Sequence, residues 1–381
     1  MLLWSAVTED PLRASWAELQ QGQAPKLLAS TPWPQGFTWP PQGFTVPLVQ
    51  PGAASPRWGV LSPDKLRVAV PVMSPDGYWQ LRALAPAEAL RKAEAAWSNE
   101  PLSVRWSPDG AHVALLEPRR VSLWQWNGTQ LVLLKDHRLH PKGSLRSLDW
   151  HPGGRWLAIG DSEQPVLLWK ADGASGPEPV KGDSGQQGVR DLAWSPRGTW
   201  LAIAEQGQYT RVIKVAEAEA APGGLPHSMQ SRYPLERVAW SPDEHLLATS
   251  DEGGTLALWH VTTGASLLHG VQPARGPGTL LVWSADSSSL LSVDRHGDAV
   301  LWQPRTSRRW EPAAEFDGKA GPLRDALFSE DGRWLAVVEN SGAVRFHPID
   351  FETLVGCVKA RQASGVRVVA RSAYSTKETL R

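Results

Sequence analysis

The chain has 381 residues, with 39 basic and 39 acidic side chains and therefore a net charge of about zero. This balance excludes a strong overall attraction to nucleic acid or to an anionic membrane, because both attractions depend on an excess of positive charge. The single cysteine, Cys357, excludes an internal disulfide and any zinc site built on cysteine.

The amino terminus, MLLWSAVTEDPLRAS, lacks the basic region and the long apolar region of a secretory signal peptide. No apolar run approaches the ~18–20 residues that a membrane-spanning helix needs. Together with the lone cysteine, these features predict a cytoplasmic protein without nucleic-acid or membrane partners. The high content of Ala, Arg and Trp indicates a bacterial source.

Residues 1–50 are predicted to form an N-terminal extension rich in Trp and Pro, in which PQGFT occurs at 34–38 and again at 41–45. Proline at this density prevents both a helix and a central strand. We expect either an extended arm held against the folded domain or a polyproline-type segment that docks in an aromatic groove of a partner. The side chains that would make these contacts are Trp33, Phe37, Trp39 and Phe44.

Residues 51–381 form the second predicted region, and one pattern recurs there every 43 to 46 residues. Apolar residues two and five positions before a bulky residue are followed by a turn such as SPDG, HPGG or SPRG. We call this bulky residue the anchor residue. The anchor residues are Leu61, Trp106, Trp150, Trp194, Trp240, Trp283 and Phe328. A repeat of fixed length indicates one supersecondary unit copied along the chain.

Each unit predicts four short antiparallel strands. The first ends at the anchor residue, the Pro and Gly or Asp residues reverse the chain, and a second strand such as RWLAIG follows. A third strand such as VLLWKA comes after a polar turn, and a weaker fourth strand such as ASLLHGV completes the unit. Trp156, Trp200 and Trp334 open second strands and are predicted to pack between units, with a ligand cage as the alternative. The one helix-like stretch is AEALRKAEAAW at 87–97.

Four short strands per ~44 residues are typical of a β-propeller blade. The chain resembles the WD-repeat β-propeller family over residues 51–358, on its SPDG-like turns and its third-strand tryptophans Trp124, Trp169, Trp259 and Trp302. It departs from the family because no Asp follows these tryptophans and the usual Gly-His pair is missing. We therefore do not expect the buried Asp–His–Ser–Trp hydrogen-bond network of the family.

The predicted fold class is all-β, a propeller of four-stranded antiparallel blades. The seven anchor residues favour seven blades. The ends leave an alternative of eight, because MLLWSAV and SGVRVVARSA each resemble a single strand, and their pairing would form a composite blade that closes the ring.

No catalytic motif of the GxSxG, HExxH, Walker or GxGxxG type is present. Asp294, His296 and Asp298 cluster as metal ligands do, but their segment aligns with the turns within 250–257 and 338–345. We interpret it as a turn, and we predict a protein that is not an enzyme and holds no metal or cofactor.

Arginine recurs four positions before the anchor position, where the innermost strand of a propeller blade begins near the mouth of the central channel. These residues are Arg57, Arg146, Arg190, Arg324 and, in a partial unit at the end, Arg367. They are either structural or inherited by duplication of the repeat, or they form a surface that prefers anions, because guanidinium groups bind carboxylate and phosphate with paired hydrogen bonds.

The resemblance implies a non-catalytic scaffold that binds a partner protein or peptide on a face of the propeller, where loop residues are free of packing duties. The alternative is a sensor or binder of an anionic small ligand or a phosphorylated segment at the arginine-lined mouth of the channel.

Overall fold

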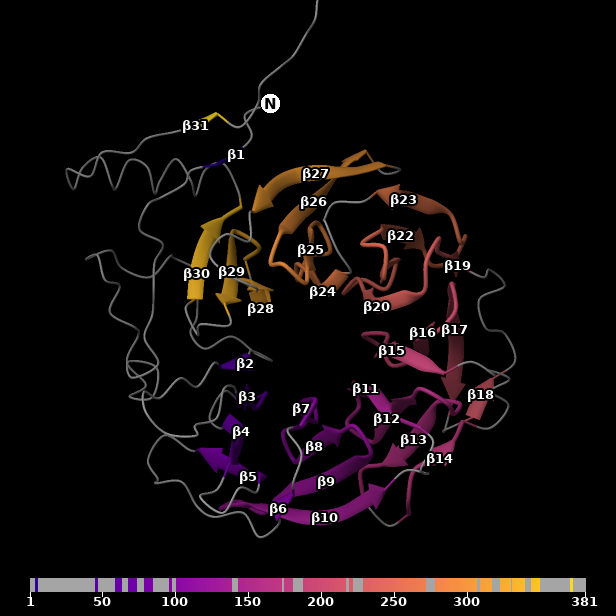
Figure 1. Ribbon diagram of the computed structural model, residues 1–381, viewed down its shortest axis with the longest axis vertical. Coiled ribbons are helices and arrows are strands. Elements are labelled where there is room, and N and C mark those ends of the chain that lie inside the picture. Colours follow the sequence, from indigo (N-terminus) through magenta and orange to yellow (C-terminus); the bar gives the residue numbers. More distant parts are fainter. Residues whose placement is uncertain are drawn as a thin grey trace, which may run out of the picture.

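In the computed structural model, β-sheets follow one another around a ring in chain order (Figure 1). The structure describes residues 101–138, 143–172, 175–180, 188–216, 229–271, 278–306, 309–316, 323–329, 331–339 and 344–349, with short pieces at 4–5, 45–46, 59–63, 68–73, 79–84, 96–97, 219–221 and 371–372. All strand pairs among these residues are antiparallel, and none of these residues is in a helix. None of them belongs to a helix that could cross a membrane.

The first strand of each sheet in the ring ends at an anchor residue, as the repeat predicts. These strands are β3 (Gly59–Leu61), β7 (Ser103–Trp106), β11 (Leu145–Trp150), β15 (Val189–Trp194), β20 (Leu235–Trp240), β24 (Gly278–Trp283) and β28 (Leu323–Phe328). The second strands are β4 (Val68–Met73), β8 (His112–Glu117), β12 (Trp156–Asp161), β16 (Trp200–Glu205), β21 (Leu246–Asp251), β25 (Leu290–Asp294) and β29 (Trp334–Glu339).

The third and outer strands complete the sheets. The third strands are β5 (Trp79–Leu84), β9 (Arg120–Trp126), β13 (Leu167–Lys170), β17 (Tyr209–Ala216), β22 (Leu256–His260), β26 (Ala299–Thr306) and β30 (Val344–Pro348). The outer strands are β6 (Ala96–Trp97), β10 (Leu131–Arg138), β14 (Glu178–Pro179), β18 (Glu219–Ala221), β19 (Met229–Gln230), β23 (Ser266–Val271) and β27 (Arg309–Phe316). Strand β6 shows that the predicted helix at 87–97 is wrong for its last two residues, and 87–95 lie outside the described residues.

Two further strand pairs come from the ends of the chain. Strand β2 (Thr45–Val46) pairs with the free edge of β3, so the predicted N-terminal extension adds a strand to the ring. Strand β1 (Trp4–Ser5) pairs with β31 (Arg371–Ser372), which is the pairing that eight blades would require. This pair lies outside the ring beside β27 (Figure 1), and the number of blades stays a prediction.

The core lies between neighbouring sheets. Trp150, for example, packs in one cluster with Ala114 and Leu116 of the preceding sheet. An alanine stands eight residues after the anchor residue in most units and is fully buried, at Ala69, Ala114, Ala158, Ala202, Ala248 and Ala336. Most units thus present an aromatic anchor residue to the preceding sheet and an alanine, among larger side chains, to the following one.

Trp156 and Trp200 also pack on clusters that span two sheets, which confirms the prediction for both. The expected loss of the family's hydrogen-bond network is wrong in part. The indole N–H of Trp259 donates to Thr249 Oγ1 (3.1 Å), and that of Trp302 donates to Ser292 Oγ (2.9 Å). Two sheets therefore keep the bond between the third-strand tryptophan and a second-strand hydroxyl.

Candidate functional site

The ring has two faces with different exposed groups. Because neighbouring strands are antiparallel, the start of each first strand lies on the same face as the turn between the second and third strands. We call this face the strand-start face. The opposite face carries the turns that follow the anchor residues, and we call it the turn-belt face.

The predicted arginine position is the extra residue of a β-bulge. In β11 the register shifts between Leu145 and Ser147, and in β15 between Val189 and Asp191. The same irregularity occurs in β20, β24 and β28. A bulge leaves one residue out of the ladder and turns its side chain aside. The bulge therefore sets the direction of the side chain at this position, and it lies on the strand-start face.

Arg190 does not stand free at this position. Its Nη2 lies 2.9 Å from Glu252 Oε1, and its Nη1 lies 4.0 Å from Glu236 Oε1. Both glutamates belong to the next sheet, and Glu236 occupies the bulge position of β20. Arg190 thus joins β15 to the neighbouring sheet. Burial raises the pKa of Glu236, and the nearby Arg190 and Arg237 lower it.

The other predicted arginines are not brought together by contacts among the described residues. Arg146 is exposed in β11. Arg324 lies in β28, but its side chain is not described. Arg57 and Arg367 lie outside the described residues, as do Trp33, Phe37, Trp39 and Phe44 of the predicted arm. The role of these residues stays a prediction.

Three of the four exposed large apolar side chains among the described residues lie on the strand-start face. Among the described residues the exposed large hydrophobics are Leu102 (53%), Tyr209 (41%), Tyr233 (37%) and Leu134 (37%). Leu102 immediately precedes β7, Tyr209 begins β17, and Tyr233 lies two residues before β20. Only Leu134 of this set is elsewhere, on the outer strand β10. Sequence reasoning missed all three residues of this face.

The loop that carries Tyr233 is fixed at several points. The Cβ that any side chain at Gly253 would need falls 2.2 Å from Tyr233 Cδ2, so the ring lies directly on the Gly253 backbone. Gln208 Nε2 donates to the carbonyl of Arg232 (2.9 Å), and the Arg232 guanidinium lies 5.5 Å from the Tyr233 ring centre. The exposed Tyr233 is thus held in one place before any partner binds.

Buried carboxylates support the turns of this face. Each stands eleven residues after an anchor residue, and they are Glu117, Asp161, Glu205, Asp251 and Asp294. Asp251 accepts hydrogen bonds from Ser231 Oγ (2.7 Å) and from the backbone N–H of Thr255 (2.8 Å). The two longer glutamates instead face an arginine, Arg120 or Arg211. The constant spacing was a signal that sequence reasoning did not use.

Asp294, His296 and Asp298 form a turn, as interpreted from the sequence. Asp294 Oδ1 accepts the backbone N–H groups of His296 (2.8 Å) and Asp298 (2.9 Å). The carboxylate is thus used in shaping the turn. Within the part of the chain that the structure describes, no group of three or more His, Cys, Asp or Glu side chains could hold a metal ion.

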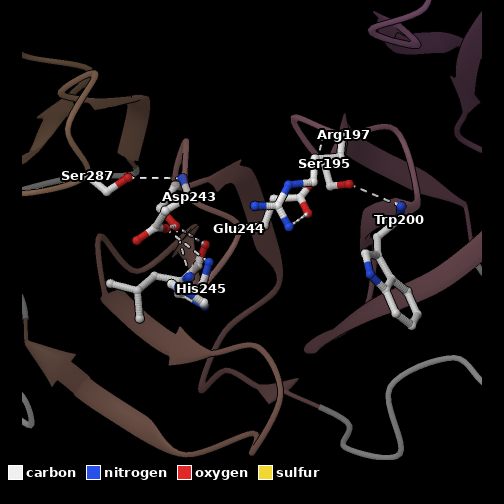
Figure 2. A network of polar contacts seen from close by, with 9 residues as sticks. Ser195, Arg197, Trp200, Asp243, Glu244, His245 and Ser287 are labelled. Carbon is white, nitrogen blue, oxygen red and sulfur yellow. Dashed lines mark hydrogen bonds and ion pairs between the residues drawn. The ribbon is translucent and has the colours of Figure 1, made fainter.

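On the turn-belt face, each turn contacts the next one around the ring. Glu244 Oε1 accepts the backbone N–H of Arg197 (2.5 Å), and Ser287 Oγ accepts that of Asp243 (3.1 Å) (Figure 2). Glu244 and Ser287 have φ angles of 64° and 61°, at a turn position where other units have glycine. The side chains of these turns are therefore used in contacts within the chain.

Comparison with known proteins identifies the fold. The family model described as "WD domain, G-beta repeat" matches residues 128–164 and 229–260. A chain from the solved structure "Crystal Structure of Mitotic Checkpoint Complex" is similar over 80% of this chain and 98% of that chain, with a TM-score of 0.58 and 18% identity. The chain folds as a WD40-repeat β-propeller. No curated protein matches it in sequence.

The predicted resemblance and the predicted all-β fold class are both confirmed. The sheets of the ring are blades of a WD40 propeller, and the anchor residues Trp150 and Trp240 fall inside the two matched repeats. Because the sequence identity is low, the comparison shows a shared fold, and no binding partner is inferred from it.

Proposed function

We propose that the chain is a non-catalytic scaffold that binds a partner protein on the strand-start face of the propeller. The observation that carries this proposal is the exposure of Leu102, Tyr209 and Tyr233 on that face. Tyrosine and arginine supply much of the binding energy at protein interfaces. Tyrosine also buries a large area at a small cost in side-chain entropy. We include the exposed Arg146 in this surface.

The preformed position of Tyr233 supports the same proposal. Binding costs less free energy when the contact residues are already ordered, and the Tyr233 loop is ordered by Gly253 and Gln208. The turn-belt face offers a contrast, because Glu244 and Ser287 bind neighbouring turns. The alternative of an anion sensor receives no support from Arg190, whose guanidinium already holds Glu252.

The test compares partner capture by tagged full-length chains in an extract of the source cells, quantified by mass spectrometry. The test variant carries Leu102→Ser and Tyr233→Ser, and the control carries Leu134→Ser on the outer strand, where the exposure equals that of Tyr233. We expect the double variant to lose a protein partner at least about tenfold, the size of a modest hot spot, while the control retains it.

Chemical denaturation of all three proteins accompanies the capture, and capture is compared where each protein is folded, because Tyr233 packs on Gly253 and its loss lowers stability. Equal capture by the double variant and the wild type would contradict the proposal. So would a loss of the same partner from the Leu134→Ser control.

A further inference from the structure

Inner contacts between neighbouring blades follow a repeated plan. The indole N–H of an anchor tryptophan donates to a backbone carbonyl of the preceding blade. Trp150 donates to Arg105 (3.2 Å), Trp240 to Ala193 (3.0 Å) and Trp283 to Ala239 (3.2 Å). Neither the indole nor the carbonyl changes its charge with pH.

The turn after the anchor residue follows a second plan. Its first residue is a buried serine whose Oγ accepts the N–H group five residues later. This holds for Ser107, Ser195, Ser241, Ser284 and Ser329. The serine hydroxyl is also uncharged at any physiological pH.

At the junction of β11 and β15, titratable groups replace both neutral contacts. The indole N–H of Trp194 is buried without a partner, and the backbone N–H of Trp194 instead donates to Asp149 Oδ2 (2.9 Å). The serine position of the turn is His151. Its Nδ1 accepts the N–H of Gly153 (2.9 Å), which leaves its Nε2–H to donate to the carbonyl of Gly198 (3.2 Å).

His151 also packs on the same junction. Its ring meets Trp194 edge to face, with the ring centres 4.8 Å apart. The Cβ of any larger residue at Gly198 would fall 2.3 Å from His151 Nε2, so the neighbouring turn lies directly against the imidazole. Asp149 and His151 therefore hold the inner strand and the turn of one junction.

The surroundings move both pKa values toward the mildly acidic range. The pKa of Asp149 is raised to about 6, mainly by burial and also by the charge of Asp191. Arg105 and the N–H groups of Trp194 and Trp150 oppose this rise. Burial lowers the pKa of His151, as does the charge of Arg155, while the contact with Gly198 raises it.

Two other charged groups border the junction. Asp109 lies beside Gly154 in the turn of His151. Arg190 of β15 is held by Glu236 and Glu252.

We propose that the junction between β11 and β15 is a pH-responsive seam of the propeller, closed or loosened by the protonation states of Asp149 and His151. The proton on Asp149 stabilises the closed seam, because the half-buried carboxylate then loses its charge. The neutral form of His151 stabilises it too, because a protonated Nδ1 cannot accept the Gly153 N–H.

The two groups act in opposite directions. Since the pKa of Asp149 is raised, its contribution is full below its ordinary value and is lost as the pH rises through about 6. Since the pKa of His151 is lowered, its contribution is present above its ordinary value and is lost as the pH falls through the lowered one. In mildly acidic solution the two contributions therefore oppose each other, and removing one group should reveal the contribution of the other.

The test is hydrogen exchange by mass spectrometry on the full chain, with four proteins: wild type, Asp149→Asn, His151→Ser and the double variant. His151→Ser restores the serine of the other turns. Residues 189–200 report the seam, and residues 278–289 provide an internal reference, because their junction has the indole and serine contacts. The ratio of protection between the two segments removes the intrinsic pH dependence of exchange.

In the His151→Ser variant we expect the protection ratio to rise about twofold by pH ~6 and about tenfold by pH ~5, relative to pH ~7.5. Asp149→Asn should lose protection on acidification, the wild type should lie between the two single variants, and the double variant should be flat. A His151→Ser variant whose pH profile is as flat as that of the double variant would overturn the proposal.

If the double variant does not fold, a measurement on the wild-type protein alone tests the proposal. An NMR titration of the Asp149 carboxyl carbon should then show protonation well above the ordinary range of aspartate. An Asp149 that remains ionised at pH ~5 would overturn the proposal.

Discussion

Glu244 and Ser287 show how a single residue can take up backbone strain for a contact. Both lie in the left-handed region, which costs a side chain about 1–2 kcal/mol relative to glycine. Each accepts a backbone N–H from the preceding turn, and such a bond contributes about 1 kcal/mol when the donor would otherwise be left unpaired. The two effects nearly offset one another, so neither glycine nor a bonding side chain is strongly preferred.

This reasoning predicts different results for two substitutions at one position. Glu244→Ala keeps the strained φ and removes the acceptor for Arg197, so the free energy of unfolding should fall by about 1–2 kcal/mol. Glu244→Gly removes the acceptor and the strain together, so it should stay within about 0.5 kcal/mol of the wild type. Chemical denaturation of both variants checks this, and an alanine variant as stable as the glycine variant would contradict it.

At the scale of the blade, large and small residues on opposite sides explain how flat sheets fit together. The anchor tryptophans meet alanines of the preceding second strand, such as Ala114 with Trp150 and Ala158 with Trp194. Dense packing needs this alternation of volume, because two layers of large side chains would leave the sheets too far apart. This arrangement accounts for the five anchor tryptophans among the 21 of the chain.

The indole hydrogen bond can be measured separately from the packing. Trp240→Phe removes both ring volume and the bond to Ala193 O. Trp194→Phe removes ring volume and a buried N–H without a partner, and it alters the ring contact with His151. We expect Trp240→Phe to lower the free energy of unfolding by about 1 kcal/mol more than Trp194→Phe. Denaturation of the two variants side by side provides the measurement, and equal losses would show that the indole bond contributes nothing.

The repeat allowed the strands to be predicted, because seven anchor positions in one phase determine where each strand ends. The partners of polar residues could not be predicted in the same way. Arg190 has Asp191 beside it in sequence but binds Glu236 and Glu252, which become neighbours only when two blades pack together. Tyr233 was missed for a similar reason, since its exposure depends on where the Gly253 turn lies.

At the scale of the whole molecule, the two faces of the ring have different roles. The turn-belt face joins blades through bonds such as Arg197 to Glu244, and these residues stand 47 apart in the chain. The strand-start face rests on buried carboxylates and presents Leu102, Tyr209 and Tyr233 to solvent. Loss of a belt contact should therefore affect stability, while loss of an exposed residue of the other face should affect binding.

The direction of the blade contacts has a consequence for synthesis on the ribosome. Every anchor tryptophan faces the blade made before it, as Trp150 faces Ala114. A growing chain can therefore cover each new anchor tryptophan as soon as its blade forms, and the side that waits for the next repeat carries alanine and aliphatic side chains such as Leu116. Shortened chains should reveal this asymmetry in the binding of a hydrophobic dye.

A chain cut before residue 278 should bind less of that dye than a chain that starts at residue 101, whose first blade would expose Trp106 and Trp124. Stronger dye binding by the chain cut at its carboxyl end would contradict the expected order. A protein with its aromatic side turned the other way would expose a tryptophan surface at every stage of translation. In the orientation found here, the preceding blade covers the tryptophan-bearing side of each new blade before the ring closes.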